Sequence, residues 1–205
     1  MYYSAVPTYK GILSYFIIGT IRYGGKINNT HLDPNLYLLD KNTEWKILSL
    51  NETNVNVPEM RYGQFMINFN TFVIMYGGMT LDNKILGDLW VLDLHTMEWL
   101  FVDLNSNTVN LPKPKFLASG ELLENTGQIV IHGGKSTLED KTLAFLNINI
   151  LLDIIRNPED LHNFDEKYFN YISKINKLWN IVEIEGILLP NIRFKFTIWS
   201  YYNSN

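Results

Sequence analysis

Positively charged residues that follow prolines at a fixed distance have the clearest potential for recognition chemistry in this chain. Lys10, Arg61 and Arg193 each lie three residues after a proline. Ammonium and guanidinium groups bind carboxylates, and the planar fork of arginine does so with two parallel hydrogen bonds. If these cations lie together on one surface, they would bind an acidic peptide. If each is buried separately, it would form a structural ion pair or donate a hydrogen bond to a main-chain carbonyl. We favour this structural interpretation over the binding one.

The histidines and carboxylates form no catalytic or metal-binding pattern. The four histidines are His31, His95, His132 and His162, and no two have the His-x3-His spacing of a helical metal pair. His132 lies inside an apolar run, where a packed side chain is expected. Asp88 and Asp93 stand at turn positions, where they cap backbone donors. The Gly-Lys-Ser-Thr stretch at 134–137 lacks the earlier glycine of a phosphate loop. We therefore predict no catalytic residue, no metal site and no cofactor.

A glycine pair that ends an apolar run recurs three times. The pairs are Gly24-Gly25, Gly77-Gly78 and Gly133-Gly134, spaced 53 and 56 residues apart. About eleven residues after each pair comes a second apolar stretch, with Tyr37 and Trp90 as its aromatic residues in the first two units. A polar turn and a tryptophan follow, and these tryptophans are Trp45, Trp99 and Trp179. A repeat of this length indicates an architecture rather than an active site.

Each unit predicts a four-stranded antiparallel sheet. The short runs rich in Ile, Val, Tyr and Phe suit pleated, packed strands. Paired glycines permit positive φ and close backbone approach at a sharp turn. Asp-x-x-Thr stretches form turns through side-chain bonds to the backbone. The tryptophan then begins a fourth strand and fills the space between neighbouring sheets.

This order of motifs resembles the kelch repeat, which forms one blade of a β-propeller. The resemblance places blade one at 8–50, blade two at 59–104, blade three at 115–185 and the first strand of a fourth blade at 191–202. The second unit matches best and the third is the loosest, since Leu117 stands where a cation should follow Pro114. The resemblance implies an all-β fold and places the cations near the central channel of the propeller.

Three blades and one strand make an incomplete ring, because propellers close with roughly four to eight blades. We expect open apolar faces at both ends and an unpaired edge strand at Phe194–Tyr201. We interpret the chain as a segment of a longer propeller protein, or as a half that pairs with another chain. A gene-model fragment is the alternative.

The third unit contains an insert at 149–177. Within it, Leu161, Phe164, Tyr168, Ile172 and Ile175 fall at three- or four-residue spacing, which predicts an amphipathic helix. We favour a helix that covers its own blade over one that docks a partner. If partners do bind, Tyr168 is a candidate contact, as are Asn83 and Lys84 in the loop between the second and third strands of unit two.

Composition narrows the class of protein. Apolar residues make up 46% of the chain and charged residues 19%, which indicates a folded core. There is no cysteine, so disulfide scaffolds and thiol catalysis are excluded. The net charge of −4 and the lack of a basic cluster argue against nucleic-acid binding. The apolar run at 12–21 is shorter than the roughly 20 residues of a membrane-spanning helix, so we predict no membrane span and a cytoplasmic location.

Together these features predict a non-catalytic interaction or scaffold module. It would bind a protein or peptide partner, including an acidic one, through the loops of the propeller. The resemblance also leaves open a regulatory propeller segment of a larger enzyme, such as a kelch-bearing serine/threonine phosphatase, or a substrate adaptor of a ubiquitin ligase. Further blades are expected in the same or another chain.

Overall fold

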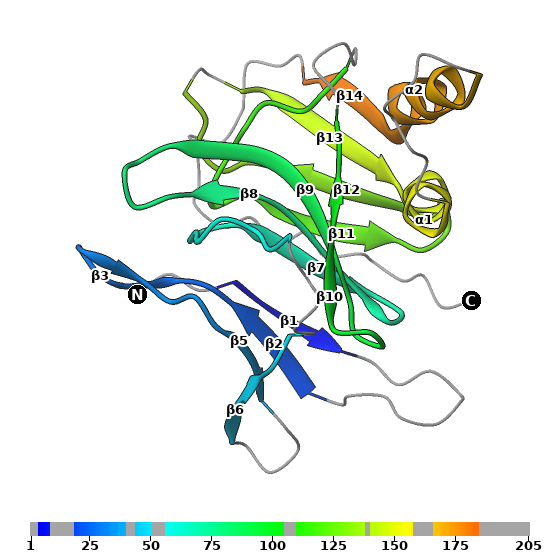
Figure 1. Ribbon diagram of the computed structural model, residues 1–205. Coiled ribbons are helices and arrows are strands. Elements are labelled where there is room, and N and C mark those ends of the chain that lie inside the picture. Colours follow the sequence, from blue (N-terminus) through cyan, green and yellow to red (C-terminus); the bar gives the residue numbers. More distant parts are fainter. Residues whose placement is uncertain are drawn as a thin grey trace, which may run out of the picture.

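The architecture is a set of three four-stranded antiparallel sheets with two helices. A computed structural model describes residues 4–8, 19–39, 44–50, 56–104, 110–137, 140–157 and 166–184 of the chain. Figure 1 shows the sheets following one another along the sequence, with both helices beside the third. This confirms the prediction of an all-β fold built from four-stranded blades, with a helical insert in the third.

In each four-stranded sheet, strands that neighbour one another in space follow one another along the chain, apart from a two-stranded hairpin inserted within the first. Blade one contains β1 (Ser4–Thr8), β2 (Gly19–Tyr23), β5 (Leu36–Leu39) and β6 (Trp45–Leu48), and the hairpin of β3 (Lys26–Asn28) and β4 (His31–Leu32) extends from it. Blade two contains β7 (Phe65–Phe69), β8 (Phe72–Met79), β9 (Ile85–Asp93) and β10 (Glu98–Val102). Blade three contains β11 (Ser119–Leu123), β12 (Gln128–His132), β13 (Thr142–Asn147) and β14 (Trp179–Glu183). Blade one therefore begins at Ser4 rather than at residue 8, and the strand expected at 191–202 lies outside the described residues.

The first strands of the three blades lie next to one another. β1 contacts β7, and β7 contacts β11, while the later strands of each sheet fan away from this line (Figure 1). Sheets that share an inner edge and diverge outward are arranged as propeller blades are. The described blades form an open arc and not a closed ring.

An apolar core lies between each pair of neighbouring blades, and blade two contributes to both cores. Val73 and Met75 of β8 face the core shared with blade one. Ile74 and Tyr76, on the opposite side of the strand, face the core shared with blade three. Side chains alternate across a strand, so a sheet buried on both faces needs a continuous apolar run. That requirement explains the Phe-Val-Ile-Met-Tyr sequence of β8.

The insert forms two helices that pack against the outer part of the blades. α1 (Ile148–Arg156) starts directly after β13, and the side chain of Asn147 caps it by accepting a hydrogen bond from the Ile150 amide at 3.2 Å. α2 (Glu166–Leu178) leads into β14. Its buried residues are Tyr171, Ile175 and Leu178, whereas Tyr168 is only half-buried. The covering role favoured from the sequence agrees with this packing, but the buried face is rotated away from Tyr168.

Candidate functional site

The junction between blades one and two is built around a short segment that leads into blade two. We call residues 58–61 the lead-in segment of that blade. The Arg61 carbonyl accepts a hydrogen bond from the Gly25 amide at 3.0 Å. The Pro58 carbonyl accepts one from the Tyr23 hydroxyl at 2.9 Å. The end of β2 in blade one is thereby bonded to the start of the next blade.

The junction between blades two and three repeats these bonds. The Lys115 carbonyl accepts from the Gly78 amide at 2.9 Å, and the Pro112 carbonyl accepts from the Tyr76 hydroxyl at 2.9 Å. Residues 112–115 are thus the lead-in segment of blade three. The proline and the cation stand three residues apart in both segments, so the predicted register of Pro114 and Leu117 was wrong.

The proline that precedes Lys10 does not stand in a lead-in segment. That proline, Pro7, lies inside β1 and pairs with Thr20 of β2. A lead-in segment precedes the first strand of its blade, whereas Lys10 follows that strand. Lys10 itself lies outside the described residues, as does Arg193.

The first glycine of each pair permits this close approach between blades. Gly24 and Gly77 have φ of 62° and 67°, in the left-handed region. A Cβ on Gly24 would lie 2.6 Å from the Arg61 carbonyl oxygen, and one on Gly77 would lie 2.3 Å from the Lys115 carbonyl oxygen. Both distances are shorter than van der Waals contact, so these junctions require glycine.

A tyrosine–tryptophan contact completes both junctions. The ring of Tyr23 lies 5.1 Å from that of Trp99, and the ring of Tyr76 lies 5.4 Å from that of Trp179. Burial raises the pKa of Tyr23 to about 12, although the charge of Arg61 opposes this, so its hydroxyl remains a donor at neutral pH. Trp45, at the corresponding position of blade one, has no earlier blade to contact among the described residues and is 46% exposed.

Arg61 is fully buried and forms an ion pair with Asp88 of its own blade. Its two terminal nitrogens lie 2.5 and 2.8 Å from the two carboxylate oxygens of Asp88. Arg61 also donates to the Gly77 carbonyl at 3.1 Å and to the Glu59 carbonyl at 2.8 Å. Asp88 accepts a further bond from the Trp90 indole at 2.7 Å. This geometry favours the structural interpretation of Arg61 over peptide binding.

Ion pairs between buried side chains shift the pKa values of the carboxylates at the junctions. Burial by itself raises the pKa of Asp88, but the hydrogen bonds and charge of Arg61, with the Trp90 indole, outweigh burial and hold it below its usual range. In blade three, the Lys115 ammonium lies 2.6 Å from the Asp140 carboxylate, and both side chains are buried. Lys115 and Asp140 thus form a buried ion pair in blade three, as Arg61 and Asp88 do in blade two. Sequence reasoning missed them, although the Pro112-x-x-Lys115 spacing was a readable signal.

The loops of blades one and two gather at one edge and expose apolar side chains. We call this area the loop surface and define it by Ile27, Val57, Met60 and Leu81, which are 51%, 50%, 50% and 39% exposed. These residues come from the β3–β4 hairpin, the stretch before Arg61 and the β8–β9 turn, which lie along the left edge of Figure 1. Backbone bonds hold the three segments together, since Gly25 bonds to Arg61 and Tyr62 pairs with Met79.

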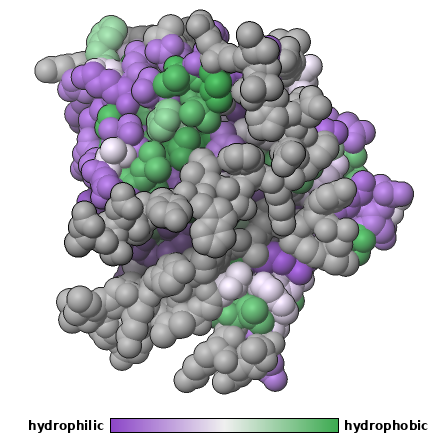
Figure 2. All heavy atoms as spheres, turned by 180° about the vertical axis from the view of Figure 1, so that it is seen from behind, coloured by the Kyte–Doolittle hydropathy of each residue, from purple (hydrophilic) through white to green (hydrophobic). Residues whose placement is uncertain are grey.

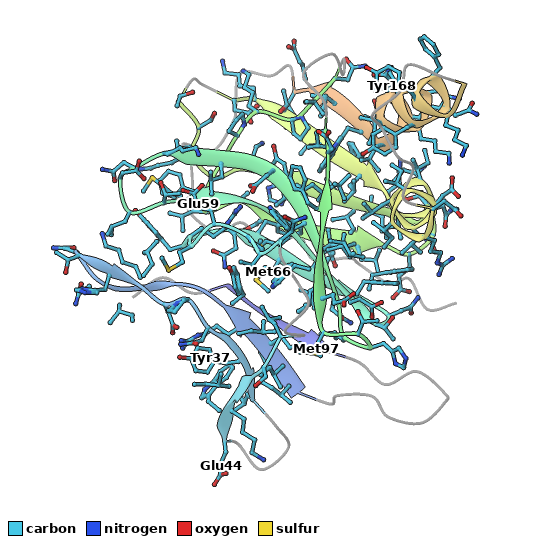
Figure 3. The ribbon with its side chains drawn as sticks, viewed as in Figure 1. Tyr37, Glu44, Glu59, Met66, Met97 and Tyr168 are labelled. Carbon is cyan, nitrogen blue, oxygen red and sulfur yellow. The ribbon has the colours of Figure 1, made fainter. Side chains whose placement is uncertain are left out.

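Two of the predicted contact residues belong to this edge and one does not. Asn83 takes a left-handed conformation in the β8–β9 turn, with φ of 66°. The neighbouring Lys84 ammonium lies 3.3 Å from the Glu59 carboxylate, and both side chains are largely exposed. Tyr168 lies on α2, where its ring packs edge-on against Phe169 at 5.7 Å. Figure 3 labels Glu59 and Tyr168 on opposite sides of the molecule, so Tyr168 does not join the loop surface.

The described residues contain no group of three or more His, Cys, Asp or Glu side chains placed to hold a metal ion. In the same residues, neither helix is long and apolar enough to cross a membrane. Burial, together with the charge of Lys115, lowers the pKa of His132, which favours the neutral imidazole.

Comparison with known proteins shows a partial similarity. No protein-family model matches the chain. The chain is similar to protein ral2 of Schizosaccharomyces pombe, with 27% identity over 118 residues. The match covers 57% of this chain but only 17% of ral2, so the chain corresponds to a small part of that protein's length.

Proposed function

We propose that this chain is a kelch-type propeller segment that binds a protein partner through its loop surface. The repeated blade junctions support the kelch-type assignment, since the same bonds recur at Tyr23 and at Tyr76. The partial similarity to ral2 agrees with a protein-interaction module. The proposal gives the chain no catalytic role.

This proposal rests mainly on four apolar side chains that are exposed at an edge formed by loops. Ile27, Val57, Met60 and Leu81 are each at least 39% exposed. Binding and recognition residues concentrate on loops that a rigid scaffold positions. Exposed apolar side chains that gather on one surface are typical of protein-binding sites. The glycine–carbonyl bonds beneath these loops supply the rigid scaffold.

The charges around the loop surface indicate the kind of partner that fits. Lys84 is 61% exposed, and its ion pair with Glu59 is open to solvent. Exposed ion pairs contribute about 0–1 kcal/mol, so a partner carboxylate replaces Glu59 at little cost. Lys26 lies 5.4 Å from the centre of the Tyr62 ring beside the same surface. The partner we propose is a peptide segment with apolar side chains flanked by acidic ones.

A displayed-peptide library tests this proposal on the intact chain. Peptides are selected on the immobilised wild-type protein. Their affinity is then measured for the wild type and for a triple variant with Ile27→Ser, Met60→Ser and Leu81→Ser. Phe169→Ser is the matched control, because Phe169 is also exposed (64%) but lies on α2. We expect the triple variant to lose at least about tenfold in affinity, while the control binds as the wild type does. Equal binding by the triple variant and the wild type would refute the proposal.

A further inference from the structure

The β3–β4 hairpin, which carries Ile27 to the loop surface, has little packing of its own. It is a separate two-stranded sheet, and none of its strand residues is buried. Its ladder is irregular between Lys26 and Asn28. Seen from behind, the right-hand edge of the molecule, where this hairpin projects, is mainly hydrophilic (Figure 2). Because an isolated two-stranded hairpin is marginally stable at best in water, contacts outside the hairpin must hold it in place.

Asp33, the residue that follows β4, provides such contacts at the base of the hairpin. Its backbone amide donates a hydrogen bond to the Gly25 carbonyl at 2.9 Å, which closes the hairpin. Its carboxylate accepts hydrogen bonds from the backbone and side-chain amides of Asn35, both at 3.0 Å, and from the Tyr37 hydroxyl at 3.3 Å. The same carboxylate forms an ion pair with Arg22. Asp33 therefore joins the base of the hairpin to β2 and β5 of blade one.

The ion pair of Asp33 differs from the two ion pairs of the lead-in segments in what it holds. Arg61 and Lys115 belong to lead-in segments, whereas Arg22 belongs to β2 of the same blade as Asp33. The Arg22 guanidinium also lies 4.3 Å from the centre of the Tyr37 ring, and the Asp33 side chain is only 6% exposed. An ion pair shielded from water in this way is stronger than one on the surface. It fixes the hairpin and not a lead-in segment.

We propose that Asp33 is a positioning residue for the loop surface, an inference that rests on the proposed function. Asp33 holds the hairpin against blade two, where the Lys26 ammonium lies 5.4 Å from the centre of the Tyr62 ring. Ile27 then lies at the same edge as the apolar residues of blade two. Without this anchor, the hairpin occupies that position only part of the time. A partner binds only the positioned fraction, so its apparent affinity falls in proportion.

Asp33→Asn tests the proposal, and Asp140→Asn is the matched control. The asparagine keeps the shape of the side chain but removes the charge that pairs with Arg22. Asp140 is also buried and paired with a cation, Lys115, but it belongs to blade three and not to the hairpin. Surface plasmon resonance measures binding of the selected peptides to the full chain, after circular dichroism has shown that each variant is folded.

The anchor should act on the association rate. We expect Asp33→Asn to lower the association rate by about fivefold and to change the dissociation rate by less than about twofold, because a positioned hairpin makes the same contacts as in the wild type. Asp140→Asn should change neither rate by more than about twofold. If Asp33→Asn does not fold, Tyr37→Phe removes only the 3.3 Å bond and should lower the association rate by about twofold.

Ile27→Ser separates the loss of position from the loss of a contact. This variant removes the side chain that the hairpin presents, so it should raise the dissociation rate. In the Ile27→Ser background, Asp33→Asn should lower the association rate by less than about twofold, because the hairpin no longer contributes an apolar contact.

Amide exchange of the hairpin, measured without peptide, keeps this proposal distinguishable from the proposed function. Asp33→Asn should speed exchange across residues 26–32 and leave β9 of blade two unchanged, whereas Asp140→Asn should leave the hairpin unchanged. Equal peptide binding by the wild type and the triple variant refutes the proposed function, whatever the exchange shows. With the proposed function intact, an unchanged exchange rate in the hairpin of Asp33→Asn, or an unchanged association rate, would overturn the role of Asp33.

Discussion

Replacing Arg61 by methionine tests whether this cation serves folding or binding. Arg61 is completely buried, and its guanidinium donates to Asp88, to the Gly77 carbonyl and to the Glu59 carbonyl. Removing one partner of a buried ion pair typically costs 3–5 kcal/mol. The Asp88 side chain is 25% exposed and keeps its bond from Trp90, so water partly solvates the stranded carboxylate. We therefore expect the lower end of the range, about 3 kcal/mol.

Substitution of the other partner of this ion pair, Asp88, should cost more stability. Asp88→Asn leaves a full positive charge on Arg61, whose side chain has no contact with water. An uncompensated charge is more costly where solvent cannot reach it. The expected order of destabilisation is therefore Asp88→Asn above Arg61→Met. Lys84→Met is the control, because its exposed pair with Glu59 should contribute no more than about 1 kcal/mol.

Urea unfolding followed by tryptophan fluorescence measures these differences, and pH adds a second check. Arg61 and Trp90 hold the pKa of folded Asp88 below its usual range, against the opposing effect of burial. The stability from this pair is fully present above the unfolded value of about 3.9 and is lost as pH falls through the lower folded value. The gap between wild type and Arg61→Met should thus narrow below about pH 4. A loss at pH 7 no larger than that of Lys84→Met would refute the structural role.

Three further substitutions probe the junctions and the insert. Gly77→Ala should lose about 1–3 kcal/mol more than Gly127→Ala in urea unfolding, because only the first forces a Cβ against a carbonyl of the next blade; equal losses would contradict this. Burial and the charge of Lys115 lower the pKa of His132, so wild-type stability should fall as pH drops below about 6.5, and His132→Asn should lack that component; identical pH profiles would count against it. Tyr171→Phe removes the bond to the Asp103 carbonyl and should cost about 1 kcal/mol in thermal unfolding, whereas an unchanged melting temperature would show that water replaces the bond.

The strand pattern could be predicted because it depends on local chemistry. Alternating and continuous apolar runs produce strands, and the glycine pairs after Tyr23 and Tyr76 take the left-handed backbone that the sequence indicated. The tryptophan of each unit also lies at the same point of its fourth strand. The helical insert was visible from its spacing, but its buried face was not, because the face that packs depends on the blades that the helix meets. Tyr171, Ile175 and Leu178 form that buried face.

The sequence prediction placed the third unit in the wrong register. The stretch at 112–115 reads Pro-Lys-Pro-Lys, so two prolines compete for the same position. The hydrogen bond from Tyr76 to the Pro112 carbonyl distinguishes them, and it joins residues 36 apart. The loop surface was missed for a similar reason, since Ile27 and Leu81 meet one edge only after two blades have packed together.

The chain by itself determined the repeat, its strands and its turns, because these arise from residue types within a few positions of one another. Only the tertiary structure decided what the cations do. Arg61 and Lys115 carry the same charge as Lys84, yet the first two are buried against carboxylates and the third is exposed. The physical reason is that the free energy of a charge depends on what covers it. For Arg61 the cover comes from Gly77 and Asp88, which lie 16 and 27 residues further along the chain.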